Sequence, residues 1–183
     1  IIQQAVIDRV SSFLSEENAN IHRGVHHLSM NATIAYDDAR STVAKFINAN
    51  SANEIIFVRG ATEAVNLVAH SFCKNRIQKD DEILVTEMEH HANIVPWQQL
   101  AAERGVEVRW IPVGDDGNLD LSDLDRLLDG VRLVAVSAAS NVLGTLPPIR
   151  RIADAAHGEA TPGKSKLQSR SFLKKSKSNT LKY

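Results

Sequence analysis

Apolar residues recur at helical spacing over the first part of the chain. This spacing predicts a helix over residues 3–17 and a second helix that begins after Ser29, its expected N-cap. The first helix is expected to carry Val6, Val10, Phe13 and Leu14 on one face, and the buried stripe of the second is expected at Ala35, Ala39, Val43 and Phe46. Both helices are therefore expected to be amphipathic.

From residue 54 onward, short apolar stretches alternate with amphipathic ones. Strands are expected at 54–58, 82–88, 106–113 and 131–139, helices at 61–73, 96–104, 120–128 and 147–157, and a turn at 115–118. Continuously apolar strands separated by amphipathic helices are typical of a parallel sheet that is covered on both faces. We therefore predict an α/β fold with a parallel or mixed sheet flanked by helices.

Composition adds little to this picture beyond the compartment. Hydrophobic residues make up 43% and charged residues 23% of the 183 residues, which is ordinary for a soluble globular protein. The sequence shows no apolar run of membrane-spanning length, and we expect no signal peptide, because no basic start followed by an apolar middle is seen. The single cysteine, Cys73, cannot form an internal disulfide, as is usual in a reducing environment. We expect a cytoplasmic protein.

The alternation ends at Gly158. Residues 158–183 contain six lysines and one arginine against a single acid, Glu159. We expect residues 1–157 to form part of one domain and residues 158–183 to form a basic tail of low order, whose composition is equally typical of a wrong reading frame. Only Phe172 and Tyr183 are aromatic there, so stacking platforms are lacking and nucleic-acid binding is not expected.

Three groups of residues lie at the carboxyl ends of predicted strands: Gly60-Ala61-Thr62, then His90, then Ser140-Asn141. Open α/β sheets bind ligands at the carboxyl ends of their strands. Gly60 would permit a tight turn, and the free N–H groups of the next helix, with the Thr62 hydroxyl, would form a cup for an anion. Such an edge can hold a phosphate, face an aromatic ring and bond a ring substituent. A capped helix and a surface histidine pair explain the same residues without any ligand.

Four segments together carry a resemblance to a known family: HRGVHHLS from His22, VRGATEAVNLVA from Val58, MEHHANIVPW from Met88 and SNVLGT from Ser140. Over residues 5–156 the chain resembles the Suf-type cysteine desulfurases, in the class V aminotransferase group of pyridoxal-phosphate enzymes. The resemblance implies the large domain of fold-type I pyridoxal-phosphate transferases, present here only in its amino-terminal part.

The resemblance also implies roles for single residues. His90 would stack on the pyridine ring, Thr62 would contact the phosphate, and Asn141 would approach the phenolic oxygen of pyridoxal 5'-phosphate. Ala61 stands where the family usually has a second threonine of the phosphate loop. The resemblance further places His22 and Arg23 beside the substrate and the dimer interface. Glu63 is grouped with them, although the helix dipole alone favours an acid in that first turn.

The implied reaction removes sulfur from L-cysteine, giving L-alanine and an enzyme persulfide, for iron–sulfur cluster assembly. The family works as a homodimer that passes sulfur to an acceptor protein. Its cofactor is held as a Schiff base to a lysine in an SGHK segment, and a cysteine on a late loop attacks the substrate sulfur. Neither segment follows His157, and Cys73, on a predicted apolar helix face, does not match. We therefore assign no catalytic residue and expect an inactive, incomplete part of the enzyme.

The sequence leaves other functions open. A class V aminotransferase or lyase that acts on another amino acid is one, and a non-catalytic fragment that binds phosphate or a partner is another. A metal site is not expected. His22 and His26 have helical i, i+4 spacing, but Gly24 lies between them and no zinc signature accompanies them.

Overall fold

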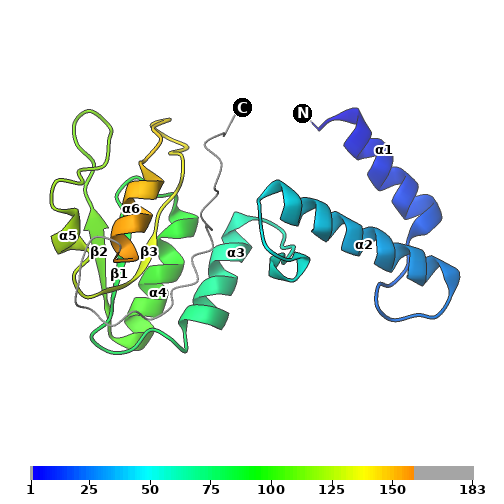
Figure 1. Ribbon diagram of the computed structural model, residues 1–183, viewed down its shortest axis with the longest axis horizontal. Coiled ribbons are helices and arrows are strands. Elements are labelled where there is room, and N and C mark those ends of the chain that lie inside the picture. The colour runs from blue at the N-terminus through cyan, green and yellow to red at the C-terminus, as the bar shows by residue number, and fades with distance from the viewer. Residues whose placement is uncertain (1, 159–183) are drawn as a thin grey trace. The chain divides into compact units, whose positions relative to one another are not determined.

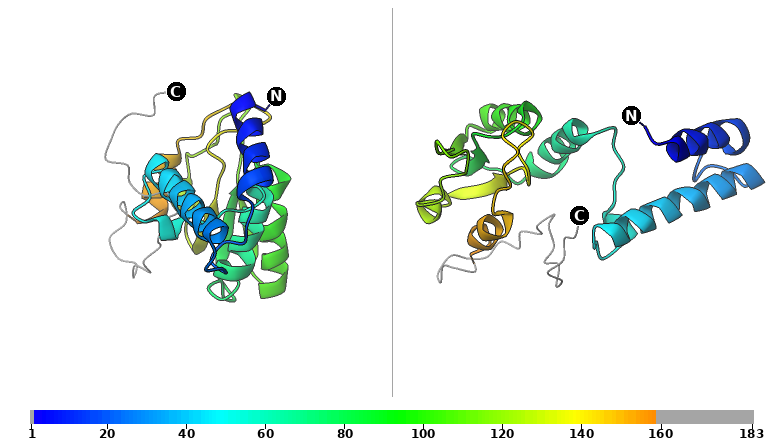
Figure 2. Two further views of the ribbon diagram at one scale, coloured as in Figure 1. Left: turned by 90° about the vertical axis from the view of Figure 1, so that its right-hand side faces the viewer. Right: turned by 90° about the horizontal axis from the view of Figure 1, so that it is seen from above.

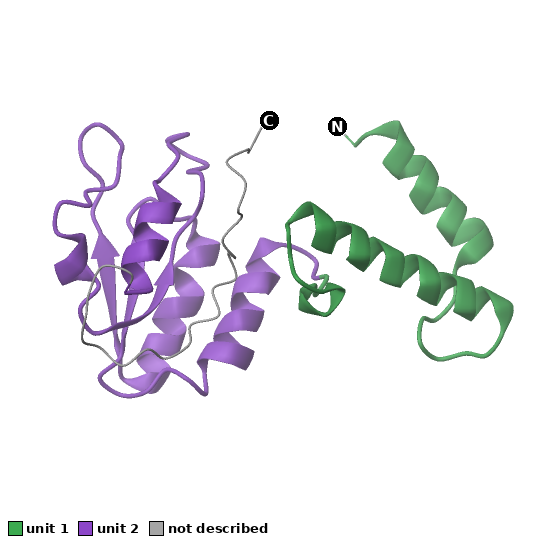
Figure 3. Cartoon of the chain, in the orientation of Figure 1, with its two compact units in different colours: residues 1–57, 171–183 green, residues 58–170 purple. Residues whose placement is uncertain are grey.

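The computed structural model describes residues 2–158, which form two compact units, residues 2–57 and residues 58–158 (Figure 3). The basic tail expected over residues 158–183 lies outside the described residues apart from Gly158. Within the described part, no helix combines the length and the apolar character that crossing a membrane requires.

The first unit is helical. Helix α1 (Gln4–Ser12) continues as a π-helical turn at Phe13–Glu17, and helix α2 spans His27–Phe46 (Figure 1). A 3-10 turn at Ala52–Glu54 follows. The helix predicted over residues 3–17 is confirmed.

The start and the buried side of α2 differ from the prediction. His26, not Ser29, is the N-cap, because its Nδ1 accepts a hydrogen bond from the Ser29 N–H at 3.4 Å. Ser29 is buried inside the helix, and its hydroxyl donates to the Asn20 carbonyl at 2.6 Å. The other buried residues of α2 are Ala32 and Ala44, whereas Phe46 is 90% exposed. The spacing of the apolar residues therefore predicted the helix correctly, but not which of its faces is buried within the first unit.

The second unit is built on a three-stranded parallel sheet with the strand order β2–β1–β3. Its strands are β1 (Glu82–Thr86), β2 (Glu107–Ile111) and β3 (Val131–Ala135). The central strand, β1, is the first of the three along the chain and pairs with both others. The predicted α/β fold with a parallel sheet is confirmed, with strands shorter than the apolar stretches that predicted them.

The strand predicted at residues 54–58 is absent from the structure. Residues 52–54 form the 3-10 turn, and residues 55–58 are in no strand. The side chain of Arg40 donates to the carbonyls of Ala52, at 2.8 Å, and Ile55, at 3.2 Å. A side chain from α2 therefore takes backbone acceptors that a neighbouring strand would otherwise bond.

Helices cover both faces of the sheet, and α4 and α6 lie on opposite sides of the strands (Figure 2). One face carries α3 (Ala61–Leu67), which continues as a π-helical turn at Val68–Cys73, and α4 (Val95–Arg104). The other face carries α5 (Leu124–Leu127) and α6 (Ile149–Ala156). Proline stands in the first turn of α4, as predicted.

Side chains along β1 alternate between these two faces. Ile83 and Val85 belong to the core under α4 with Trp97 and Leu100, whereas Leu84 belongs to the core under α6. The core under α6 also contains Ile111, Leu121, Leu124 and Ile152. All three apolar residues of β1 are 0% exposed, which explains why the strand reads as a continuous apolar run.

At the amino-terminal ends of the strands, one arginine links several segments. Arg109 of β2 donates to the carboxylate of Glu82 at 2.6 Å and to the carbonyls of Asp129, at 2.9 Å, and Arg126, at 3.1 Å. Both charged side chains are mostly covered. This clamp ties β1, β2 and the segment before β3 together at the edge opposite to the ligand-binding edge of such sheets.

Candidate cofactor-binding edge

The carboxyl ends of the strands and the start of α3 lie at the same end of the second unit (Figure 1). β1 leads into the segment that holds His90, and β3 leads into Ser140 and Asn141. Helix α3 contacts the 3-10 turn His91–Asn93, so the helix that carries Thr62 packs beside the turn that follows His90. Segments far apart in sequence thus meet at one edge.

His90 is exposed, and its ring is oriented by a bond within its own turn. Its Nδ1 accepts a hydrogen bond from the Ala92 N–H at 3.1 Å and so caps the 3-10 turn. The neutral ring therefore carries its proton on Nε2. The ring of His91 lies 6.0 Å away, centroid to centroid, at 66°, so the two rings do not stack on each other. Because His90 is exposed, its ring is accessible to a ligand.

The start of α3 is open rather than tightly turned. Gly60 has an extended backbone, φ 169° and ψ 177°, which any residue adopts, so the tight turn predicted there is wrong. A Cβ atom built on Gly60 would meet no atom within 4 Å. Ala61 and Thr62 are exposed, and the first N–H groups of the helix point away from its own carbonyls. Donors and open space therefore coincide at this helix start.

Glu63 is paired with Arg59. Its carboxylate accepts hydrogen bonds from the Arg59 backbone N–H at 2.7 Å and from Arg59 Nε at 3.1 Å. The bond from the Arg59 side chain, followed by that from its backbone, lowers the pKa of Glu63. The carboxylate stays ionised at neutral pH and is matched locally by a guanidinium.

Asn141 lies on a short closed loop after β3. The buried Ser140 hydroxyl accepts hydrogen bonds from the N–H groups of Val142, at 3.3 Å, and Leu143, at 3.0 Å. The Ser140 N–H donates to the Thr145 carbonyl at 2.9 Å and closes the loop. The exposed side chain of Asn141 is thus carried by a backbone fixed on both sides.

Glu89 is a polar residue of this edge that the sequence did not single out. The residue is only 8% exposed. Its carboxylate accepts hydrogen bonds from Thr86 Oγ1 at 2.9 Å, Asn93 Nδ2 at 2.8 Å, the backbone N–H of Ser137 at 2.7 Å, and the Ser137 hydroxyl. The only signal was an acidic residue between a buried strand and a histidine, which is ordinarily taken as a surface position.

His22 and Arg23 belong to the first unit. His22 has a left-handed backbone, φ 55°; its N–H donates to Thr33 Oγ1 at 3.0 Å, and its ring meets Tyr36 edge-on at 6.0 Å. Tyr36 in turn meets Phe57 edge-on at 5.7 Å. Arg23 is exposed. A non-glycine residue at positive φ is strained, so His22 is held by its surroundings.

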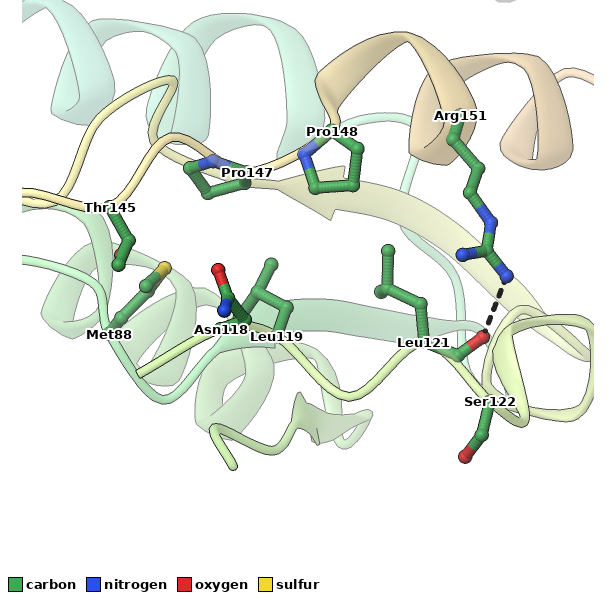
Figure 4. A pocket seen from close by; sticks show the side chains of 9 residues that line it. All are labelled: Met88, Asn118, Leu119, Leu121, Ser122, Thr145, Pro147, Pro148 and Arg151. Atoms are coloured by element: carbon green, nitrogen blue, oxygen red, sulfur yellow. Dashed lines mark hydrogen bonds between the residues drawn. The ribbon is translucent and has the colours of Figure 1, made fainter. Parts of the chain in front are cut away.

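The residues of this edge do not line the cavities of the second unit. A cavity of about 320 Å³ lies between the segment Asn118–Ser122 and the segment from Thr145 to Arg151 (Figure 4). Arg151 donates across its end to the Leu121 carbonyl at 3.1 Å (Figure 4). Neither this cavity nor a second one between α5 and α6 includes His90, Thr62 or Asn141. The candidate edge is an open surface.

The described residues offer neither a metal centre nor an accessible thiol. No group of three or more His, Cys, Asp or Glu side chains in residues 2–158 is arranged to hold a metal ion. Cys73 is 2% exposed in the core under α4, and burial raises the pKa of its thiol despite the opposing charge of Arg76. Cys73 is a packing residue.

The chain belongs to the class V aminotransferase family, because the family described as "Aminotransferase class-V" matches residues 1–161. It is 56% identical over 147 residues to a cysteine desulfurase of Pectobacterium atrosepticum, covering 80% of this chain and 36% of that protein. It is 50% identical over 155 residues to a probable cysteine desulfurase of Mycolicibacterium paratuberculosis, covering 84% of this chain and 23% of that protein. The chain thus spans about a third or less of the length of these relatives.

Solved structures agree with this assignment. The apo cysteine desulfurase of Thermococcus onnurineus superposes with a TM-score of 0.81 at 37% identity, over 85% of this chain and 38% of that one. The cysteine desulfurase CsdA of Escherichia coli superposes with a TM-score of 0.72 at 34% identity, over 86% of this chain and 40% of that one. The fold is that of the amino-terminal part of a pyridoxal-phosphate transferase large domain.

Proposed function

We propose that the chain is the cofactor-binding part of a Suf-type cysteine desulfurase and that it binds pyridoxal 5'-phosphate. The observation that carries the proposal is His90: an exposed ring, oriented by its own cap bond, just beyond the carboxyl end of the central parallel strand. Ligands of open α/β sheets bind at this edge. Similarity to cysteine desulfurases supports the choice of ligand.

The residues of the edge fit the cofactor part by part. The N–H groups at the start of α3 and the Thr62 hydroxyl are donors suited to a phosphate, and the space beside Gly60 is open to it. A face of the His90 ring suits the pyridine ring. The Asn141 amide is a donor suited to the phenolic oxygen. Ala61 contributes only its backbone N–H, since it has no hydroxyl.

The proposed reaction takes sulfur from L-cysteine for iron–sulfur cluster assembly and leaves L-alanine. The cofactor supplies the electron sink for this chemistry when it is bound. The guanidinium of Arg23 is suited to hold the substrate carboxylate through two parallel hydrogen bonds. We place His22 and Glu63 beside the substrate or the subunit interface. A homodimer, a sulfur-acceptor protein and a cytoplasmic location complete the proposal.

Binding of the cofactor tests this function directly. We expect the chain to bind pyridoxal phosphate saturably in equilibrium dialysis, and pyridoxal, which lacks the phosphate, at least about tenfold more weakly, since one hydrogen bond to a charged group contributes about 1.5–3 kcal/mol. Thr62→Val keeps the side-chain shape without the hydroxyl and is expected to weaken only the binding of the phosphorylated form. Equal binding of both compounds by both proteins would indicate adducts on surface lysines and contradict the proposal.

We expect the chain by itself to release neither sulfide nor alanine from L-cysteine above the rate of free pyridoxal phosphate. The one cysteine in the sequence, Cys73, is buried, and its thiol has a raised pKa, so it presents no thiolate to a substrate. Alanine and sulfide are measured in the same reaction, with a full-length cysteine desulfurase as the positive control. Equimolar release of both products by this chain would contradict the expectation.

A further inference from the structure

The carboxylate of Glu89 is unusual in being buried without a cation. None of the ion pairs among residues 2–158 involves it. Four hydrogen-bond donors surround it instead, from Thr86, Asn93 and twice from Ser137. A carboxylate has about four acceptor positions, so its accepting capacity is filled. Burying a charge is unfavourable unless such bonds offset it, so this arrangement indicates a specific role for the carboxylate.

An indole fixes the direction of these bonds. The Nε1–H of Trp97, which is 3% exposed, donates to Asn93 Oδ1 at 3.0 Å. Because an indole N–H is only a donor, the Asn93 amide must turn its oxygen toward Trp97 and its NH₂ group toward Glu89. Position 89 must therefore present an acceptor to Asn93 while it accepts from Thr86 and Ser137. A carboxylate satisfies all of these donors, whereas an amide does not.

The network joins the two segments that carry the proposed cofactor contacts. Glu89 directly precedes His90, and it accepts hydrogen bonds from the backbone N–H and the hydroxyl of Ser137. Ser137 lies 48 residues after Glu89 in sequence and four residues before Asn141. Through Asn93 it also holds the turn that His90 caps. The same carboxylate thus sets the spacing between the loop after β1 and the loop after β3.

We propose that Glu89 is the positioning residue of the cofactor edge: it holds the His90 ring and the Asn141 loop at the separation that one pyridine ring requires. The inference rests on the proposed function, since it assigns Glu89 a role toward the same ligand. Glu89 does not touch the cofactor. It acts through the segments on either side of the binding surface.

The test reverses the direction of the hydrogen bond between the side chains at positions 89 and 93. Glu89→Gln keeps the shape of the side chain but turns an NH₂ group toward the NH₂ group of Asn93. We expect the Kd for pyridoxal phosphate to rise about tenfold. This is the lower end of the loss in affinity that metal sites show when a residue supporting a ligand is removed. In Glu89→Gln/Asn93→Asp, the new carboxylate accepts from both Trp97 and Gln, so binding is expected to return to within about twofold of the original. Asn93→Asp alone sets two carboxylates together and is expected to bind weakly.

Glu82→Gln is the matched control, because it removes a carboxylate from the amino-terminal end of β1, whereas Glu89 lies beyond the carboxyl end of that strand. It should leave the Kd unchanged at a temperature where tryptophan fluorescence reports a folded chain. A second readout is the upfield NMR shift of the His90 ring protons on addition of pyridoxal phosphate, which should shrink in Glu89→Gln and return in the double variant. A purely structural role would not move this signal in a folded protein.

The outcomes separate the two proposals. Saturable binding that Glu89→Gln leaves unchanged, or weakens no more than Glu82→Gln does, overturns the positioning role and leaves the function standing. Absence of saturable binding by the unsubstituted chain overturns the function and the positioning role with it. If Glu89→Gln unfolds, the double variant decides: wild-type affinity supports the role, and weak binding in a folded double variant overturns it.

Discussion

Leu84→Ala is expected to lower the free energy of unfolding of the second unit by about 2–5 kcal/mol. Leu84 is 0% exposed in the middle of the central strand and packs in the core under α6 with Ile111 and Ile152. Truncation removes buried methyl groups and leaves a cavity, because strands on both sides prevent the site from closing. Urea denaturation measures the effect. Both tryptophans of the sequence, Trp97 and Trp110, lie in this unit, so their fluorescence reports it alone.

Leu146→Ala is the matched control, because the same atoms are removed from a side chain that is 63% exposed. Its effect is expected to stay within about 0.5 kcal/mol. Similar losses in the two variants would show that Leu84 is not at the centre of a packed core, and the described sheet would then be wrong.

His90→Asn is expected to raise the Kd for pyridoxal phosphate by about tenfold. An aromatic pair contributes about 0.5–1.5 kcal/mol beyond the area that it buries, and the buried ring face adds to this. Asparagine is a good N-cap, so this variant keeps an acceptor for the Ala92 N–H while removing the ring. The turn should therefore remain intact, and the loss in equilibrium dialysis can be assigned to stacking.

Two variants complete this experiment. His90→Phe keeps an aromatic ring without the cap acceptor and is expected to retain most of the affinity. His91→Ala removes the neighbouring exposed ring and is expected to change nothing, since that ring does not stack on His90. Full affinity in His90→Asn, or an equal loss in His91→Ala, would contradict the proposed role of His90.

The three strands of the sheet and the position of His90 shortly after β1 were predictable from the sequence because both depend on local pattern. The centre of β1, Ile83–Val85, is apolar since both faces are covered, and a histidine shortly after such a strand lies at its carboxyl edge. The start of α3 was predictable for the same reason, as a helix that opens after a glycine. Only the tight turn at Gly60 was wrong, because sequence does not give φ and ψ.

The features that sequence missed depend on contacts between distant residues. Residues 54–58 have the apolar pattern of a strand, but Arg40 of α2 donates to the carbonyl of Ile55 among them and to that of Ala52 just before them. Glu89 reads as a surface acid, and its burial depends on Ser137, 48 residues further along. Neither contact is visible in the residues next to it in sequence, so a single sequence cannot indicate it.

The strand order β2–β1–β3 also determines how long β1 lacks a pairing partner while the chain is being synthesised. The apolar strand β1 is made first, and its second partner, β3, follows only after roughly 50 more residues. At about 5–20 residues per second, the side of β1 that pairs with β3 stays unpaired for between about 2.5 and 10 seconds. For that interval its unpaired backbone and its Ile83–Val85 side chains are exposed to other nascent chains, so we expect slower translation of residues 87–135 to increase aggregation without changing the folded structure.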